Sequence, residues 1–176
     1  MSYSVAKMLK TMQVTFDALA APEGHAFVCS DLTHLWQLLF QKDNALRILI
    51  MYNGETFRET SPGLDILGRV DRHFMVVVSR GRGLNVERGV PLYTDTSAGG
   101  PALYSWVEKV RDYCRALIFD SEWTEQPTYP KSVEPFNTQG APLIIDAYTV
   151  HFDVGVQLGQ LNGPGDNALL EAVTET

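Results

Sequence analysis

The residues best suited to chemistry by type and spacing lie in one basic, glycine-containing stretch, VVVSRGRGLNVERGV, at residues 76–90. Arg80, Arg82 and Arg88 stand among glycines, an arrangement that could cradle phosphate. A P-loop, however, requires a lysine and a hydroxyl residue after its last glycine, and a dinucleotide-binding loop runs directly into a helix. This stretch has neither feature. We interpret it as a strand that continues into a basic loop, whose arginines are solvated or pair with acidic groups of a partner.

The remaining candidate residues do not form a recognisable catalytic or metal-binding pattern. The histidines have no HxxxH spacing, the cysteines no CxxC spacing, and the chain has no GxSxG motif. Carboxylates at Asp120 and Glu122, and again at Asp146 and Asp153, could perform acid–base catalysis only if the fold placed them in a shared cleft. We therefore predict no catalytic, cofactor-binding or metal-binding residues and no enzymatic activity. The four histidines are His25, His34, His73 and His151.

Composition is that of an ordinary globular domain of 176 residues, with 45% apolar and 20% charged residues. No apolar run reaches the roughly 20 residues of a membrane helix, and the N-terminus lacks a secretory layout. The net charge of −7 disfavours a general nucleic-acid binder, which needs a basic surface. Cys29 and Cys114 do not form a disulfide framework, and we expect both to be reduced in apolar surroundings.

Three segments have the apolar periodicity of helices. Residues 4–20 form one amphipathic pattern, with Ser4 as a plausible N-cap. A shorter pattern begins at Ser30 or Asp31. Residues 101–118 give the strongest helical signal, with Pro101 suited to the first helical position. The residues predicted to face inward are Val5, Met8, Leu9, Met12, Phe16 and Leu19 in the first helix, Leu32, Leu35, Trp36 and Leu39 in the second, and Leu103, Trp106, Val107, Val110, Cys114, Leu117 and Ile118 in the third.

Four further segments resemble strands. Residues 46–53 are short and apolar and, like residues 69–80, rich in residues that favour strands. Residues 141–159 alternate between an apolar face and a polar face with His151 and Asp153. The short segment 131–137 could pair with the last strand, and its Pro135 would confine it to a sheet edge. The sequence thus predicts an α+β fold in a single domain, residues 1–160. Its helices would pack on one face of a mixed, mostly antiparallel sheet with a closing C-terminal β-hairpin. Residues 161–176 would form an acidic, flexible tail.

Two long connections, residues 81–100 and 120–142, stand out because such loops are uncommon in compact domains. Both carry apolar side chains, which need something to bury against. They could contact a partner or fold back over the core of their own domain. The residues that we predict for a subunit or partner interface are Arg80, Arg82, Arg88, Tyr93, Trp123, Tyr129 and Phe136.

The element order and length resemble the tail terminator and tail-completion (neck) proteins of long-tailed bacteriophages. The resemblance rests on SVAKMLKTMQVTFDAL, LRILIMYN, DRHFMVVVSR, PALYSWVEKVRDYCRALIF and LIIDAYTVHFDVGVQL. It covers most of the chain as topology and pattern, without a diagnostic motif. An added short helix between residues 21 and 46 and a longer C-terminal tail depart from the plainest members.

The resemblance implies a structural virion protein that caps the tail tube as a ring, typically a hexamer, and joins it to the head connector. The implied partners are further copies of the chain, the tail tube protein and the head–tail connector protein, with DNA only as cargo in the channel and no membrane. The implied location is the neck of the virion, and the host cytoplasm during assembly. The alternatives are another neck or head–tail joining protein, or a small ligand-binding or enzymatic α+β domain with a pocket of converging polar groups.

Overall fold

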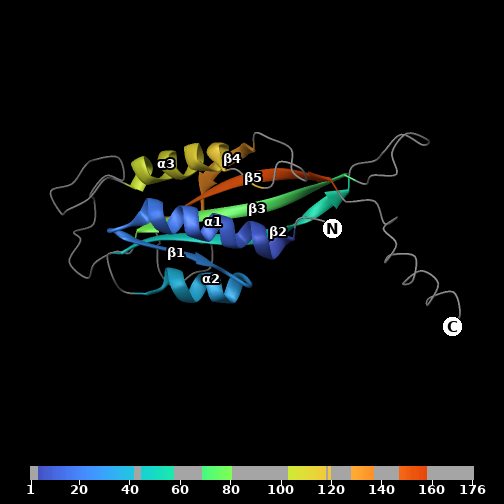
Figure 1. Ribbon diagram of the computed structural model, residues 1–176. Helices are drawn as coiled ribbons and strands as arrows, with labels where there is room; N and C mark the ends of the chain where they lie inside the picture. Colours follow the sequence, from blue (N-terminus) through green and yellow to red (C-terminus); the bar gives the residue numbers. More distant parts are fainter. Residues whose placement is uncertain are drawn as a thin grey trace, which may run out of the picture.

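A computed structural model of the protein describes a mixed five-stranded sheet with three helices packed against it (Figure 1), in the residues that it covers. The described residues are 4–41, 45–57, 69–80, 103–117, 119, 128–136 and 147–157. The elements are α1 (Val5–Ala20), β1 (Gly24–Val28), α2 (Leu32–Leu39), β2 (Leu46–Phe57), β3 (Arg69–Arg80), α3 (Leu103–Ala116), β4 (Tyr129–Pro135) and β5 (Ala147–Gln157).

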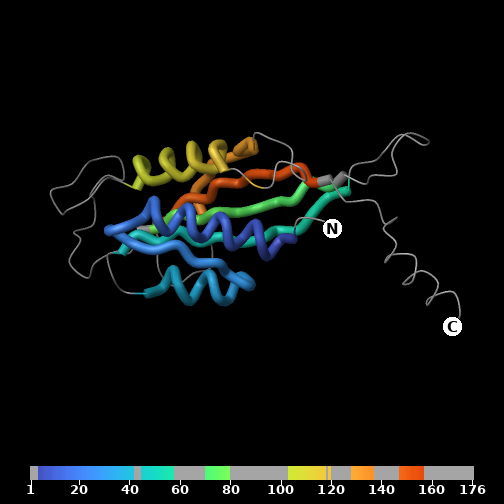
Figure 2. The backbone as a smooth tube through the Cα atoms, viewed as in Figure 1, coloured from blue at the N-terminus to red at the C-terminus, as the bar shows by residue number. Residues whose placement is uncertain are grey.

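The sheet has the strand order β1-β2-β3-β5-β4. Strands β1 and β2 are parallel, and every other neighbouring pair is antiparallel. The predicted α+β class, the mostly antiparallel sheet and the pairing of the last two strands are therefore confirmed. In Figure 2 the strands β2, β3 and β5 run alongside one another and extend past the N-terminal end of α1. We call this part of the sheet the distal end, comprising residues 55–57, 69–73 and 153–157.

One face of the sheet is covered by α1 and α3, and we call it the α1–α3 face. The helices pack onto alternate residues of the three long strands, as the 3.6-residue and 2-residue periodicities require. The side chains that meet between these helices and strands are almost completely buried in one core. They include Met8, Met12 and Phe16 of α1, Trp106, Val107 and Val110 of α3, and Ile48, Ile50, Phe74, Val76, Val150 and Phe152 of the sheet.

The opposite face carries a second, smaller core beneath α2, and we call it the α2 face. Here Leu35, Leu38 and Leu39 of α2 pack against a set of strand residues of opposite parity: Leu49, Met51, Met75, Val77 and Ala147. The helices therefore cover both faces, and the expected arrangement on one face does not hold for α2. The physical reason is that residues 46–51 are buried at every position and all except Arg47 are apolar, so β2 buries both of its faces.

Strand β1 was not predicted from the sequence, and it places α2 on the second face. It adds to the edge of β2 in parallel, with Gly24 opposite Leu46. A Cβ atom on Gly24 would collide with the carbonyl group of Leu46, so a glycine permits this close approach. Asp17 of α1 fixes the strand from the other side, because its Oδ1 accepts from the backbone N–H of Ala26 at 3.0 Å. The short strand therefore leads the chain from α1 on one face of the sheet to α2 on the other.

The predicted N-caps of the first two helices are confirmed, whereas Pro101, the predicted start of the third helix, lies outside the described residues. The Ser4 side chain accepts from the backbone N–H of Lys7 at 3.2 Å, and Asp31 caps α2 in the same way through His34 at 2.8 Å. The inward face of α2 differs from the prediction, since Leu32 is 55% exposed and Leu38 is buried instead. Both cysteines are reduced and buried, as expected. Burial raises the pKa of Cys29 to about 11 and that of Cys114 further.

Candidate functional site

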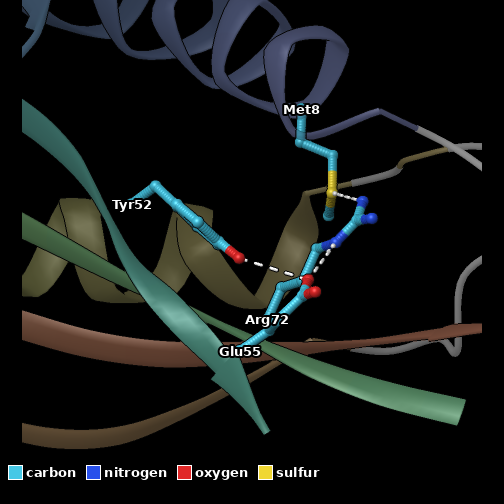
Figure 3. Close-up of polar contacts among 4 residues, drawn as sticks. All are labelled: Met8, Tyr52, Glu55 and Arg72. Carbon is cyan, nitrogen blue, oxygen red and sulfur yellow. Dashed lines mark hydrogen bonds and ion pairs between the residues drawn. The ribbon is translucent and has the colours of Figure 1, made fainter. Parts of the chain in front are cut away.

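Polar side chains gather near the distal end of the sheet, on both faces. On the α1–α3 face, Arg72 of β3 is only 5% exposed. Its Nε donates to Oε2 of Glu55 at 3.3 Å, and its Nη1 lies 3.4 Å from the sulfur of Met8 in α1 (Figure 3). The Tyr52 hydroxyl donates to the same Glu55 oxygen at 3.2 Å. This Arg72 cluster therefore links β2, β3 and the first turn of α1 around a buried charge, which folded proteins keep only when it is paired.

The electrostatics of the Arg72 cluster keep the tyrosine a hydrogen-bond donor. Partial burial raises the pKa of Tyr52, and the negative charge of Glu55 and the hydrogen bond to it act in the same direction. The positive charge of Arg72 opposes this shift but is the smallest of the four causes. A protonated hydroxyl can donate to the carboxylate, whereas a phenolate would repel it.

A β-bulge in β2 decides which side chains reach each face. The register moves from Tyr52 opposite Phe74 to Glu55 opposite Arg72, so two residues of β2 stand against one of β3. Gly54 in the bulge has a φ of 94°, a conformation that favours glycine. Without the extra residue, simple alternation would place Glu55 on the α2 face. The bulge instead turns Glu55 toward Arg72 and turns the following residue, Thr56, toward the α2 face.

On the α2 face, a row of hydrogen-bonded polar side chains crosses four neighbouring strands, and we call it the polar ladder. Thr56 Oγ1 of β2 lies 2.7 Å from Nε2 of His73 in β3. His73 Nδ1 lies 2.7 Å from Oδ1 of Asp153 in β5. The other carboxylate oxygen of Asp153 forms an ion pair with Lys131 of β4. One side chain from each strand thus makes a continuous chain of contacts.

The chemistry of its members fixes the direction of the hydrogen bonds in the ladder. An ionised Asp153 can only accept, so Nδ1 of His73 must donate to it. In the neutral imidazole the other nitrogen, Nε2, then has a free lone pair and accepts the hydroxyl proton of Thr56. The side chain of His73 is 27% exposed and that of Asp153 is 15% exposed, whereas Thr56 is exposed. The arrangement is an exposed hydroxyl beside an oriented base.

A second cross-strand pair lies next to the ladder. His151 Nε2 of β5 is 2.9 Å from Oε1 of Glu134 in β4. This pair and the ladder both bind the edge strand β4 to β5 through side chains. Within the described part of the chain, no group of three or more histidine, cysteine, aspartate or glutamate side chains could hold a metal ion.

Exposed apolar side chains flank these polar groups. Phe57, at the end of β2, is 65% exposed, and on the edge strand β4 Tyr129 is 62% and Val133 is 42% exposed. Strand β4 also carries Pro130 and Pro135, which lack an N–H and so discourage pairing with a further strand. Contacts at this edge would therefore be made by side chains more readily than by backbone pairing.

The predicted interface residues fall in different places. Tyr129 lies on the exposed edge strand, as a partner contact requires. Phe136 is half-buried and stacks edge to face on Trp36 of α2 with ring centroids 5.3 Å apart, so it covers the second core. Arg80 ends β3 opposite Leu46. The side chain of Arg80 lies outside the described residues, as do Arg82, Arg88, Tyr93, Trp123 and the tail 161–176.

Sequence reasoning missed both polar clusters, although two signals were present. Asn53 and Gly54 interrupt the apolar strand pattern, and a glycine inside a strand indicates a bulge. Arg72 occupies a core-facing parity in β3, which predicts a buried partner. Neither signal shows which residue would pair with a polar side chain of β3, because Glu55 and Asp153 come from the two strands on opposite sides of β3.

No protein-family model matches the chain, and no curated protein gives a significant match. Among the described residues, no helix is long and apolar enough to cross a membrane.

Proposed function

We propose that the protein is a structural component of the virion of a long-tailed bacteriophage, which caps the tail tube as a ring and joins it to the head connector. The observation that carries the proposal is the element order. An amphipathic N-terminal helix, a central antiparallel strand pair, a helix on the same sheet face and a closing antiparallel pair are the arrangement expected for tail-completion proteins. Its location is then the virion neck.

The surface of the distal end supports an assembly role. Phe57 and Tyr129 are large, exposed aromatic side chains on strands, and aromatic residues supply much of the binding energy at protein interfaces. In a ring, each subunit uses two different faces for its two neighbours. The proposed partners are other copies of the chain, the tail tube protein and the connector protein. DNA passes through the channel as cargo, and a net charge of −7 suits a surface that must not retain it.

The first experiment is light scattering of the purified protein over a concentration series, with negative-stain images of the same samples. Closed rings of about six subunits are the expected result. If the protein stays monomeric, it is mixed with tail tube subunits, because ring closure can require the end of the tube. A protein that forms no ring alone and does not bind assembled tubes contradicts the proposal.

Surface variants locate the contact. We expect Phe57→Ser or Tyr129→Ser to weaken assembly about 30-fold, the loss that corresponds to about 2 kcal/mol for a truncated interface aromatic. Val14→Ser is the matched control, because Val14 is 58% exposed on α1, away from the distal end. Equal assembly by all three variants would remove the distal end and β4 from the interface.

A second candidate function, a small enzymatic domain, is favoured by one specific observation. The contact between Thr56 and His73, with Asp153 behind the imidazole, is an arrangement that nucleophilic catalysis uses. Ligand-induced stabilisation in a thermal-shift screen would support this candidate over the structural one.

A further inference from the structure

We propose that Thr56 is a reactive hydroxyl that attacks activated carboxylic esters, with His73 as its general base and Asp153 as the residue that positions the imidazole. The inference does not depend on ring formation. It rests on the polar ladder, where a hydroxyl, an imidazole and a carboxylate from three adjacent strands contact one another at 2.7 Å and 2.7 Å. An activated nucleophile is recognised by this sequence of contacts, whatever the fold.

The direction of the proton transfer follows from the hydrogen bonds. Asp153 accepts from Nδ1 and so holds His73 in the tautomer whose Nε2 faces Thr56 with a lone pair. Lys131 contacts the other carboxylate oxygen of Asp153, Oδ2, so Oδ1 is the oxygen that faces His73. All partners of the imidazole thus favour transfer of the hydroxyl proton from Thr56 to Nε2. Among the described residues, the other titratable groups nearby on this face are Asp71, which stands opposite Thr56 in the strand register, and His151 with its partner Glu134.

The position of Thr56 leaves it accessible to a substrate. It is exposed, near the end of β2. Strand β1 pairs with β2 only from Leu46 to Ile50, so in the described residues β3 is the sole strand beside Thr56. An ester can approach the exposed Thr56 from above the α2 face. Since the residue lies on an open surface, the geometry favours a small acyl group with a good leaving group.

The reaction balances without a further reactant except water. Oγ1 of Thr56 attacks the ester carbonyl carbon as its proton passes to Nε2 of His73. The bond from carbon to the leaving oxygen breaks, and the alcohol departs with that proton. Water then attacks the acyl-threonine while His73 takes its proton, and the proton passes to Oγ1 as the acyl–oxygen bond breaks. The products are a carboxylic acid and an alcohol, and the side chains return to their starting state.

The test uses p-nitrophenyl acetate and the full-length protein. We measure p-nitrophenolate release and locate the acetyl group by peptide mapping. The internal reference is Thr33, an exposed threonine in α2 that lies outside the ladder. We expect Thr56 to be acetylated about 100-fold faster than Thr33, which is the modest end of general-base catalysis. Equal acetylation of the two threonines in the wild-type protein overturns the proposal.

Variants separate a reactive role from a structural one. His73→Asn keeps an N–H toward Asp153 but removes the base, and it should lower acetylation of Thr56 about 100-fold. Asp153→Asn no longer selects the tautomer, so the rate should fall and its pH profile should change shape. Thr56→Val should lose the p-nitrophenolate release that Thr33→Val retains. Unchanged acetylation in His73→Asn contradicts the proposal, and if that variant unfolds, the Thr56 and Thr33 rates decide alone.

Ring assembly of Thr56→Val is measured by light scattering in the same samples. Loss of esterase activity with normal rings would support the reactive hydroxyl and leave the assembly proposal intact. Rapid acetylation of Thr56 in a wild-type protein that neither forms rings nor binds assembled tubes would contradict only the assembly proposal. The two proposals therefore fail on different measurements.

Discussion

The two faces of the sheet differ in how far the core extends, and β5 displays both in one strand. On the α1–α3 face, Val150, Phe152, Val154 and Val156 are all buried, so apolar packing continues to the distal end. On the α2 face, Ala147 and Thr149 are buried, but His151 contacts Glu134 and Asp153 pairs with Lys131 near the surface. The apolar core therefore extends further along the strands on the α1–α3 face than on the α2 face. Two long helices cover one face, and the eight-residue α2 covers part of the other.

The largest expected effect compares two adjacent residues of β5. Phe152→Ala should lower the free energy of unfolding by about 4 kcal/mol, because Phe152 is fully buried and stacks on Phe74 with centroids 5.4 Å apart. His151→Ala, on the other face, should cost less than about 1 kcal/mol, as expected for a partly exposed ion pair. Urea unfolding measures both. Similar losses would mean that the two faces contribute equally to stability.

The next effect concerns the smaller core beneath α2. Leu35→Ala should cost about 3 kcal/mol, since Leu35 is fully buried on the α2 face. Leu32→Ala, three residues earlier and 55% exposed, is the control and should change stability by no more than about 0.5 kcal/mol. A larger loss for Leu32→Ala would restore the sequence-based prediction that Leu32 faces inward.

A smaller effect tests the charged group in the otherwise apolar α1–α3 face. Glu55→Ala should lower the free energy of unfolding by about 2 kcal/mol, because it removes a charge-assisted hydrogen bond from the buried Arg72. Combining it with Arg72→Met should recover part of the loss, since no buried charge is left behind. If the double variant is less stable than Glu55→Ala, the guanidinium stabilises the fold through its other contacts.

The smallest effect is a dependence of stability on pH at the junction of α1 and β1. The hydrogen bond from Ala26 N–H, and then that with His25, hold the pKa of Asp17 below its ordinary value of 3.8. A carboxyl whose pKa is lowered in the folded state stabilises the protein above the unfolded pKa, and this stabilisation is lost as pH falls through the folded value. Asp17→Asn should therefore be less stable than the wild type at neutral pH.

The measurement for Asp17 is a set of urea midpoints between about pH 7 and about pH 3. The difference between wild type and Asp17→Asn should begin to shrink as the pH falls below 3.8, because protonation of Asp17 then starts to remove its stabilising charge. Val14→Ser, an exposed substitution on the same helix, should shift the midpoint equally at every pH. A constant difference for Asp17→Asn would show that its charge does not contribute to stability.

The fold was largely predictable from periodicity. The helix at residues 4–20, the strand at 69–80 and the helix beginning near 101 were predicted close to their observed limits, because each has a long pattern of one period. The strand β1 was missed because five residues, GHAFV, are too few to establish an alternation. The sequence also did not predict that a helix covers the α2 face, for a related reason. Residues 46–51 are apolar except for Arg47, and such a run does not indicate which element covers each side.

The candidate site was predictable only in part. Tyr129 and Phe136 were both predicted to contact a partner. Tyr129 is exposed at the sheet edge, whereas Phe136 packs on Trp36 of the same chain. Residue type could not separate these outcomes, since both are aromatic residues near the ends of the same strand. The interface prediction for Tyr129 stays a prediction that ring assembly tests.

By itself, the sequence determined the elements and the apolar face of each one, because both depend on spacings within a single segment. The tertiary structure alone decided which strands became neighbours and hence which polar groups met. Thr56, His73, Asp153 and Lys131 come from four strands, and the strand order and register bring them together. The extra residue at Gly54 then selects the face on which Thr56 lies. Pairing across a sheet is a long-range choice, and no local pattern in this chain encodes it.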